Sequence, residues 1–542
     1  MQLLTLNFLL LAASGVEVAA HTLEQVEAQF SSYLQRAGSD WLSTQGQLAV
    51  GCRLACGFLE FVLPSQISYP NSTTYTFEES RYWSQQQALT EPTCRFSPES
   101  TLDVSFAVLA LQVAQCEFAV KSGGHAAFEG ASNIQGGMTI DLANLNEITV
   151  RSDGTQTAVG AGNIWYDVYT TLQPLELTVI GGRVSAIGVG GLSLGGGISF
   201  FSGRYGWACD NVNNYEVVLA DGSIQDVNFS SPYSDLYWAL RGGGNNFGIV
   251  TRFDLMTFTQ GDLWAGSETF LYTPDTASAI NEAFYWLGVN APSDPYAQVI
   301  LAYAYAQSEG VYIIASDLQY GKPVADPPIL QNFTSVEGAV ASTLRIVDQS
   351  NLTIEFNNTN PGGYRYVSNP QDTNDKPSLN RNCRQTYWTL TVGNNATLMT
   401  DMVAIYMDHI DPLKNVSGIV PSLVFQPITT DMISHFSKNG GNALGLDGQG
   451  PLNLVQIDIS WSDIADDDRI MTAAQNILDG CQAAASAAGL LNKYVYQNYA
   501  SAEQNVFSGY GQKNLARLKA VSAKYDPAQV FQKLQPGYFK LD

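Results

Sequence analysis

The chain has 542 residues, which is too long for one small core, so we expect two domains. Hydrophobic residues make up 45% and aromatic residues 11%, a composition that can bury a core and that excludes a disordered chain. The formal net charge of −24 argues against nucleic acid and against anionic membrane surfaces as partners. Charged residues amount to only 14%, which favours an extracellular protein.

Residues 1–20 are predicted to be a signal peptide. Residues 3–13 form an apolar stretch that is too short to span a bilayer, and small residues at positions 18–20 suit cleavage before His21. Sequons for N-glycosylation also favour secretion. They lie at Asn71, Asn228, Asn332, Asn351, Asn357, Asn395 and Asn415.

Cysteine usage agrees with an oxidising compartment. An even number of cysteines precedes the first glycine-rich motif, which predicts two disulfides whose pairing the sequence leaves open. These residues are Cys52, Cys56, Cys94 and Cys116. Cys209 is predicted to be a buried free thiol. With four histidines and no CxxC motif, we expect no metal site.

The N-terminal half mixes short helices and strands. After a Cys-containing lead-in over 21–88, Ser100 or Thr101 is expected to cap a helix with apolar residues at helical spacing. Strands are expected over 138–142 and 249–255, hairpins over 147–159 and 215–227, and helices over 164–172 and 234–240. This mixture predicts an α+β fold.

After about residue 258 the pattern changes to longer alternating segments. Strands are expected over 298–305, 312–318 and 454–461, and helices over 275–287, 397–409 and 469–488. This pattern predicts a separate antiparallel sheet backed by helices, which we assign to residues 261–490.

Three glycine-rich runs carry the functional signal, at residues 121–125, 188–197 and 242–248. Backbone N–H groups in such runs can converge on the oxygen atoms of an anionic ligand. No GxGxxG motif opens a helix after a first strand, so a Rossmann dinucleotide fold is not predicted. The first run, Lys121-Ser122-Gly123-Gly124-His125, also presents an imidazole on a tight loop.

The three runs in this order, with His125 ahead of the other two, resemble the FAD domain of the vanillyl-alcohol oxidase superfamily. The similarity is greatest to the berberine bridge enzyme-like flavoproteins of plants and fungi. It implies a PCMH-type FAD-binding domain over 89–260, the inserted substrate domain, and a C-terminal segment over 491–542 that returns to the FAD domain. It also implies that FAD is bonded covalently to His125.

The resemblance assigns further residues to the cofactor. They are Ser122, Gly123, Gly124, Ile187, Gly188, Gly190, Gly191, Gly195, Gly196, Gly243, Gly244, Asn245, Gly248, Ile249 and Asn498. Some relatives carry a second flavin bond through a Cys, but that position is Val184 here, so one bond is expected. Ile187 is the residue that guards the approach of oxygen in the family, where a smaller Val accompanies oxidases. We therefore expect slow use of oxygen.

The substrate side is predicted from the second domain and the C-terminal segment. The family presents a polar residue over the flavin five residues before a Trp, which corresponds to Gln456. Because an amide is a poor proton acceptor, the base must be another residue. Tyr496, in a Tyr-x-Asn-Tyr element, and Asp458 are the candidates.

These features predict a secreted FAD-linked oxidoreductase that acts on a small organic substrate, with oxygen as electron acceptor and no metal. Two enzymatic interpretations remain open, an oxidase of secondary metabolism and a carbohydrate oxidase that makes a lactone. The third hypothesis is a secreted flavin-binding protein without turnover. The protein is expected to be a monomer that binds neither nucleic acid nor membrane.

Overall fold

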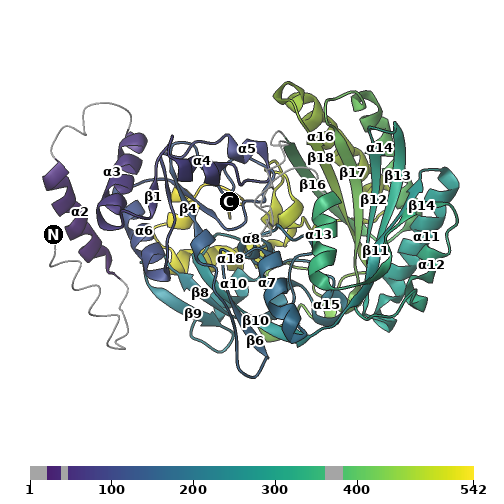
Figure 1. Ribbon diagram of the computed structural model, residues 1–542, viewed down its shortest axis with the longest axis horizontal. Helices are drawn as coiled ribbons and strands as arrows, with labels where there is room; N and C mark the ends of the chain where they lie inside the picture. The colour runs from purple at the N-terminus through teal and green to yellow at the C-terminus, as the bar shows by residue number, and fades with distance from the viewer. Residues whose placement is uncertain (1–20, 38–46, 360–382, 542) are drawn as a thin grey trace.

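The computed structural model describes residues 21–37, 47–359 and 383–541, so the predicted signal peptide lies outside the described residues. Two bodies lie side by side (Figure 1). One holds the N-terminal elements, drawn in purple and blue, together with the yellow C-terminal segment. The other holds the long teal and green strands. The predicted α+β architecture is confirmed, with an antiparallel sheet inserted between the two parts of the first body.

The first sheet has the order β1-β2-β4-β3, and β4 runs parallel to both β2 and β3. Its strands are β1 (Ile67–Ser68), β2 (Cys94–Phe96), β3 (Phe118–Lys121) and β4 (Met138–Asp141). Helix α6 (Thr101–Ala114) connects β2 to β3, and its cap is Ser100, whose side chain accepts from the Asp103 N–H. This cap satisfies a backbone donor that the helix itself leaves unpaired.

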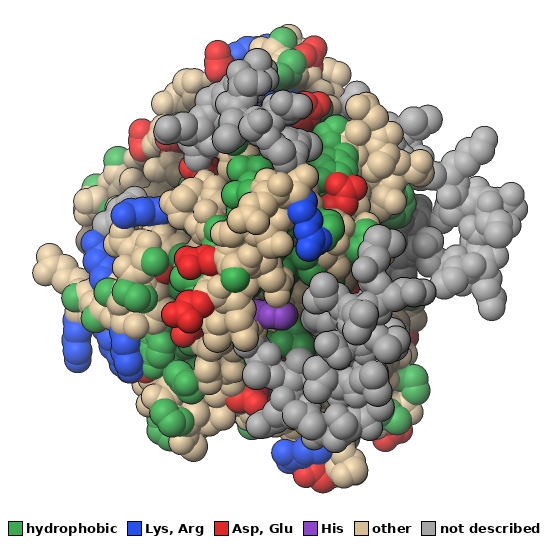
Figure 2. Space-filling model, turned by 90° about the vertical axis from the view of Figure 1, so that its left-hand side faces the viewer, with side chains coloured by type: hydrophobic (Ala, Val, Ile, Leu, Met, Phe, Trp, Pro, Cys, Tyr) green, Lys and Arg blue, Asp and Glu red, His purple; other side chains and the backbone are tan. Residues whose placement is uncertain are grey.

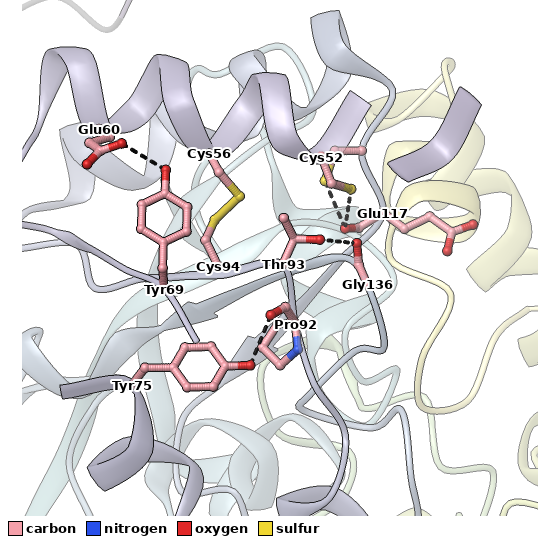
Figure 3. Close-up of a disulfide and its surroundings, with 11 residues drawn as sticks. Cys52, Cys56, Glu60, Tyr69, Tyr75, Pro92, Thr93, Cys94, Glu117 and Gly136 are labelled. Carbon is pink, nitrogen blue, oxygen red and sulfur yellow. Dashed lines mark hydrogen bonds between the residues drawn. A yellow bond between two sulfur atoms is a disulfide. The ribbon is translucent and has the colours of Figure 1, made fainter. Parts of the chain in front are cut away.

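Two disulfides fasten the lead-in to this sheet. Helix α2 (Leu23–Ala37) is followed by α3 (Gln47–Val62), and α3 carries Cys52 and Cys56 one turn apart. Cys52 is bonded to Cys116, which precedes β3, and Cys56 is bonded to Cys94 at the start of β2 (Figure 3). The two predicted disulfides are thus confirmed, and they join one helix to the strands on both sides of β4.

The second sheet completes the first body. Its order is β5-β6-β10-β8-β9, and β7 also pairs with β10. The strands are β5 (Ile148–Val150), β6 (Gln156–Gly160), β7 (Leu177–Val179), β8 (Val212–Val218), β9 (Ile224–Asn228) and β10 (Ile249–Thr259). Helices α7 (Trp165–Leu172), α8 (Val189–Leu194) and α10 (Ser234–Leu240) lie along the same stretch of chain.

The third sheet forms the second body and has the order β14-β11-β13-β12-β17-β18-β16-β19, with β15 beside β11. Its strands are β11 (Leu263–Leu271), β12 (Ala297–Ala306), β13 (Val311–Tyr320), β14 (Ala339–Ser342), β15 (Arg345–Val347), β16 (Arg384–Gly393), β17 (Val420–Ile428), β18 (Leu452–Trp461) and β19 (Leu491–Asn492). Helices α11 (Pro274–Asn290), α14 (Ala396–Ile410) and α16 (Asp467–Ala487) pack against one face of it (Figure 1).

The C-terminal segment returns to the first body, where α17 (Val506–Gly509) and α18 (Gln512–Tyr525) contribute to the first core. The segment between β17 and β18 does the same, since Phe436 and Leu444 are buried in that core. The first core therefore recruits residues from within the predicted substrate domain. The exact domain boundaries stay a prediction.

Acidic and basic side chains are interspersed on the face drawn in Figure 2. Within the described ranges, no helix has both the length and the apolar character to cross a bilayer. The same residues contain no group of His, Cys, Asp and Glu arranged to hold a metal ion. Cys209 is buried and free, as predicted.

Candidate functional site

The first and second glycine runs touch backbone to backbone. A Cβ on Gly123 would lie 2.4 Å from the Gly188 nitrogen, and one on Gly188 would lie 2.3 Å from the Gly123 nitrogen. The Ser122 hydroxyl donates to the Ala161 carbonyl at 2.6 Å and accepts from the Gly190 N–H at 3.1 Å. A side chain at Gly123 or Gly188 would force the two loops apart. The close contact between the loops therefore requires glycine at both positions.

The third run and the C-terminal segment meet the second run. The Gly244 N–H donates to the Leu194 carbonyl at 3.2 Å. A Cβ on Gly195 would lie 2.0 Å from Oδ1 of Asn498, and one on Gly244 would lie 2.5 Å from Nε2 of Gln497. The side-chain amide of Gln497 is buried, and neither of its polar atoms has a hydrogen-bond partner. Buried polar atoms are normally paired, so this cradle fits a polar ligand such as FAD.

Other predicted cofactor residues have different surroundings. A Cβ on Gly191 would meet no atom within 4 Å, so this position opens onto free space. Gly243 and Gly248 are instead required by packing, because a Cβ there would lie 2.3 Å from the Ala239 carbonyl and 2.6 Å from the Val217 side chain, respectively.

Three more predicted cofactor positions contact other parts of the chain. Gly196 has a φ of 117° beside Trp207. Ile249 is buried in β10, and the Asn245 amide donates to the Gly537 carbonyl at 3.4 Å. Their contacts in the structure are therefore with the chain itself.

Lys121 of the first glycine run belongs to a buried cluster of charged residues. Asp141, at the end of β4, accepts from Lys121 at 2.7 Å and from Arg95 at 2.6 Å, and all three side chains are fully or almost fully buried. Neighbouring Glu79 also pairs with Arg95. Buried charges that lose a partner are costly, so this cluster holds β3 and the loop after it in one arrangement.

His125 lies flat against Trp83, with ring centroids 4.4 Å apart and planes inclined by 10°. The backbone N–H of Trp83 donates to the Gly124 carbonyl at 3.0 Å, which links the stacked pair to the glycine loop. Burial lowers the pKa of His125 to about 4. The imidazole is therefore neutral at pH 7, and one ring nitrogen keeps a free lone pair that can form a bond.

Tyr387, on β16, connects this loop to the third sheet. Its ring lies 4.9 Å from that of Trp83, and its backbone pairs with Asp458 on β18. The phenol hydrogen bonds with both Asp458 and Gln456. Burial raises the pKa of Asp458 to about 8, and burial together with the Asp458 charge raises that of Tyr387. Sequence reasoning missed Tyr387. Its only signal in the sequence is the alternation of side chains along β16, and its pairing with Asp458 is visible only in the structure.

Tyr496 has a different environment from the one expected of a base. It is 1% exposed, and its oxygen accepts from the N–H groups of Gly197 at 3.2 Å and Ile198 at 3.3 Å. The Asn498 amide donates to the same oxygen at 3.0 Å. Burial raises the pKa of this phenol. The contacts make Tyr496 an anchor between the C-terminal segment and the second glycine run, and its role as base stays a prediction.

The loop between β7 and α8 carries the two positions at which the resemblance implied departures. Val184 and Ile187 are both partly exposed, and the Ile187 carbonyl accepts from the Trp165 N–H at 3.0 Å. The loop also carries Arg183, which the sequence did not single out. Its Nη2 donates to Gln426 on β17 at 2.5 Å and to the Tyr499 hydroxyl at 2.9 Å.

Comparison with known proteins identifies the class. Residues 92–228 match the family of FAD binding domains. The chain is 36% identical to the FAD-dependent monooxygenase tpcD of Cochliobolus heterostrophus, over 91% of this chain and 94% of that one.

Solved structures share the fold. With 6-hydroxy-D-nicotine oxidase from Arthrobacter nicotinovorans the TM-score is 0.71 at 18% identity, covering 88% of this chain and 97% of that one. With glucooligosaccharide oxidase from Acremonium strictum it is 0.67 at 20% identity, covering 88% and 97%.

The protein is thus an FAD-dependent oxidoreductase. Within that class it belongs to the family of fungal FAD-dependent monooxygenases that includes tpcD. Its fold is that of berberine bridge enzyme-like oxidoreductases, such as those of Physcomitrella patens and Arabidopsis thaliana. The converging glycine runs are where such a chain would hold the cofactor.

Proposed function

We propose that this protein is a secreted, monomeric oxidase with FAD bonded to His125, and that it oxidises a small organic substrate of secondary metabolism. The observation that carries the proposal is the line of contacts from His125 through Trp83 and Tyr387 to Asp458. It joins the loop expected to hold the flavin to a carboxyl group with a raised pKa. The glucooligosaccharide oxidase of known structure is described with an 8α-N1-histidyl FAD, which supports the bond to His125.

The bound flavin would accept a hydride from a substrate C–H group and pass the two electrons to oxygen. The protein residues would handle the remaining proton of an alcohol or enol. Asp458 accepts it, because its raised pKa of about 8 matches that task near neutral pH. Tyr387 lies between Asp458 and the site and orients the donor oxygen, and Gln456 hydrogen bonds the phenol from the same strand. Tyr496 is the alternative base.

Secretion is supported by the two disulfides and by the predicted signal peptide and sequons. Secondary metabolism is supported by the similarity to fungal FAD-dependent monooxygenases. A carbohydrate oxidase is the second candidate, because amide side chains lie along the sheet face that also carries Gln456. Gln298, Gln319 and Gln426 are all buried on that face. Such groups suit a substrate rich in hydroxyl groups.

The covalent bond is tested by acid precipitation. The wild-type protein is expected to keep its yellow colour in the pellet, whereas His125→Ala releases flavin into the supernatant. The His125→Ala protein should keep its thermal stability to within a few degrees, since His125 lies on a loop and is not fully buried. Full release of FAD from folded wild-type protein would contradict the bond, and a flavopeptide containing another residue would relocate it.

Turnover is tested separately from cofactor binding. Anaerobic bleaching of the flavin by a panel of hydroxylated aromatics, enols and oligosaccharides would identify the substrate class, and no bleaching by any of them would favour a flavin-binding protein without turnover. Because relatives are named monooxygenases, labelled oxygen is needed as well. An oxidase gives one peroxide per substrate and no label in the product.

A further inference from the structure

Arg183 carries a buried positive charge whose partners are incomplete. Arg183 is only 6% exposed, and its Nη1 atom has no hydrogen-bond partner. Among the residues that the structure describes, no carboxylate lies within ion-pair distance of the guanidinium. A buried guanidinium without a directly paired carboxylate is costly unless its N–H groups find other partners.

The other guanidinium nitrogen is well fixed. Nη2 is shared between Oε1 of Gln426, at 2.5 Å, and the hydroxyl of Tyr499, at 2.9 Å. These two neutral acceptors come from β17 and from the C-terminal segment, so both bodies hold the side chain in place. A guanidinium that served only to pack would be expected to use its second terminal nitrogen as well.

The sheet beside Arg183 has unpaired polar groups of its own. Gln298 on β12 and Gln319 on β13 are direct neighbours across the two strands, and they are 1% and 0% exposed. None of the four polar atoms of their side-chain amides has a partner. Because Leu301 pairs with Phe425, continuing the register places Gln426 near Gln298 on the same face of the sheet.

The nearest acidic group interacts with Arg183 but does not form an ion pair with it. Asp317, on β13, interacts electrostatically with Arg183, and burial raises its pKa to about 6, so most of this carboxyl group is ionised at pH 7. Its backbone pairs with Ser267, and its side chain hydrogen bonds that residue. This part of the sheet therefore brings together one fixed cation, two unpaired amides and a carboxyl group that does not form an ion pair with the cation.

We propose that Arg183 binds an anionic oxygen of the substrate, a carboxylate, enolate or phenolate, and that Gln298 and Gln319 hydrogen bond further oxygens of the same molecule. The inference rests on the proposed function, because it places the substrate between these polar groups and Asp458. It narrows the substrate class to oxygen-rich acids and acidic enols or phenols. Arginine suits the task because its planar fork can meet two oxygen atoms at once.

Isothermal titration of the holoenzyme with sodium benzoate at pH 7 tests the charge requirement, with benzamide as the neutral probe of the same shape. The wild type is expected to bind benzoate at least about tenfold more tightly than benzamide. Arg183→Met should weaken benzoate binding by roughly 10- to 100-fold and leave benzamide unaffected. The benzoate affinity of Arg183→Lys should fall between those of the wild type and Arg183→Met, since lysine keeps the charge and loses the planar guanidinium. Arg151→Met, which removes an exposed charge from a hairpin, is the matched control.

Two outcomes would overturn the proposal. The first is a wild type that does not prefer benzoate, and the second is an Arg183→Met protein with unchanged benzoate affinity. If the second is accompanied by a lowered flavin midpoint potential, the cation is assigned to the reduced cofactor instead. Thermal melting of Arg183→Met guards against misfolding, and we expect little change because removal of a buried charge without an ion pair offsets the two lost hydrogen bonds. Loss of acid-stable flavin in a protein that still prefers benzoate would refute the covalent linkage alone.

Discussion

The proposed site has a flavin side and a substrate side, and the two are built by different means. On the flavin side, backbone contacts backbone, as at Gly123 and Gly188, and these positions require the absence of a side chain. On the substrate side, the residues lie on paired strands, and their roles depend on the chemistry of their side chains. They are Tyr387, Asp458 and Gln456. A cofactor common to a family can be held by the first kind of site. The second kind can change with the substrate, because replacing a strand side chain leaves the ladder of hydrogen bonds intact.

The largest expected effect is on the substrate side, at Asp458. Asp458→Asn keeps the shape and removes the proton acceptor, so anaerobic flavin reduction should slow by roughly two to four decades. In the wild type the rate should rise with pH toward about 8, where the carboxyl ionises, and then level off. The variant should show no such rise. An unchanged rate and pH profile in Asp458→Asn would transfer the role of base to Tyr496.

The same carboxyl also predicts how stability depends on pH. Its pKa rises from 3.8 to about 8 on folding, so between these values the unfolded chain is ionised while the folded protein holds a proton. Ionisation therefore favours the unfolded state, and this contribution to stability falls as pH rises from about 4 to about 8. Asp458→Asn should flatten that part of the melting-temperature profile. An equally steep decline in both proteins would mean that other groups cause it.

The next effect is on the flavin side. In Gly188→Ala the new methyl group would lie 2.3 Å from the Gly123 nitrogen, so the two loops must separate. We expect a loss of roughly 1–3 kcal/mol in unfolding free energy, typical of overpacking, measured by denaturant titration. Gly191→Ala is the matched control, because its methyl group would meet no protein atom within 4 Å. If Gly191→Ala keeps its stability but retains less flavin, the open space beside Gly191 belongs to the cofactor.

The two tyrosines provide a direct comparison between the sides. Tyr496→Phe leaves the Gly197 and Ile198 N–H groups without their acceptor, which should cost roughly 1–3 kcal/mol of stability. Tyr387→Phe removes a phenol that faces the site and should mainly slow flavin reduction. Melting temperature and stopped-flow reduction, measured on both variants, separate the roles. A Tyr496→Phe protein of normal stability with reduction slowed by decades would restore Tyr496 as the base.

The sequence draws attention to more residues on the proposed flavin side than on the proposed substrate side. Glycine runs are visible in a single sequence because the absence of side chains is itself the signal, and the cap at Ser100 and the hairpins follow from local rules. Tyr387 and Arg183 were missed because each gains its role from a partner distant in the chain. Asp458 pairs with Tyr387 only through strand register, and Gln426 meets Arg183 across the two bodies. Local propensity carries no information about such contacts.

The smallest expected effect concerns oxygen. Ile187 precedes Gly188, and its carbonyl carbon would lie 3.5 Å from a Cβ on Gly123, so it stands at the junction of the first two glycine runs. Its side chain is one methylene larger than Val and is only partly exposed, so the extra carbon can take up part of the space through which oxygen would approach. Ile187→Val should therefore speed reoxidation of the reduced flavin several-fold, by about 1 kcal/mol or less in the barrier, while reduction by substrate stays unchanged. Stopped-flow mixing of the reduced proteins with oxygen measures this, and equal rates would show that Ile187 does not restrict access.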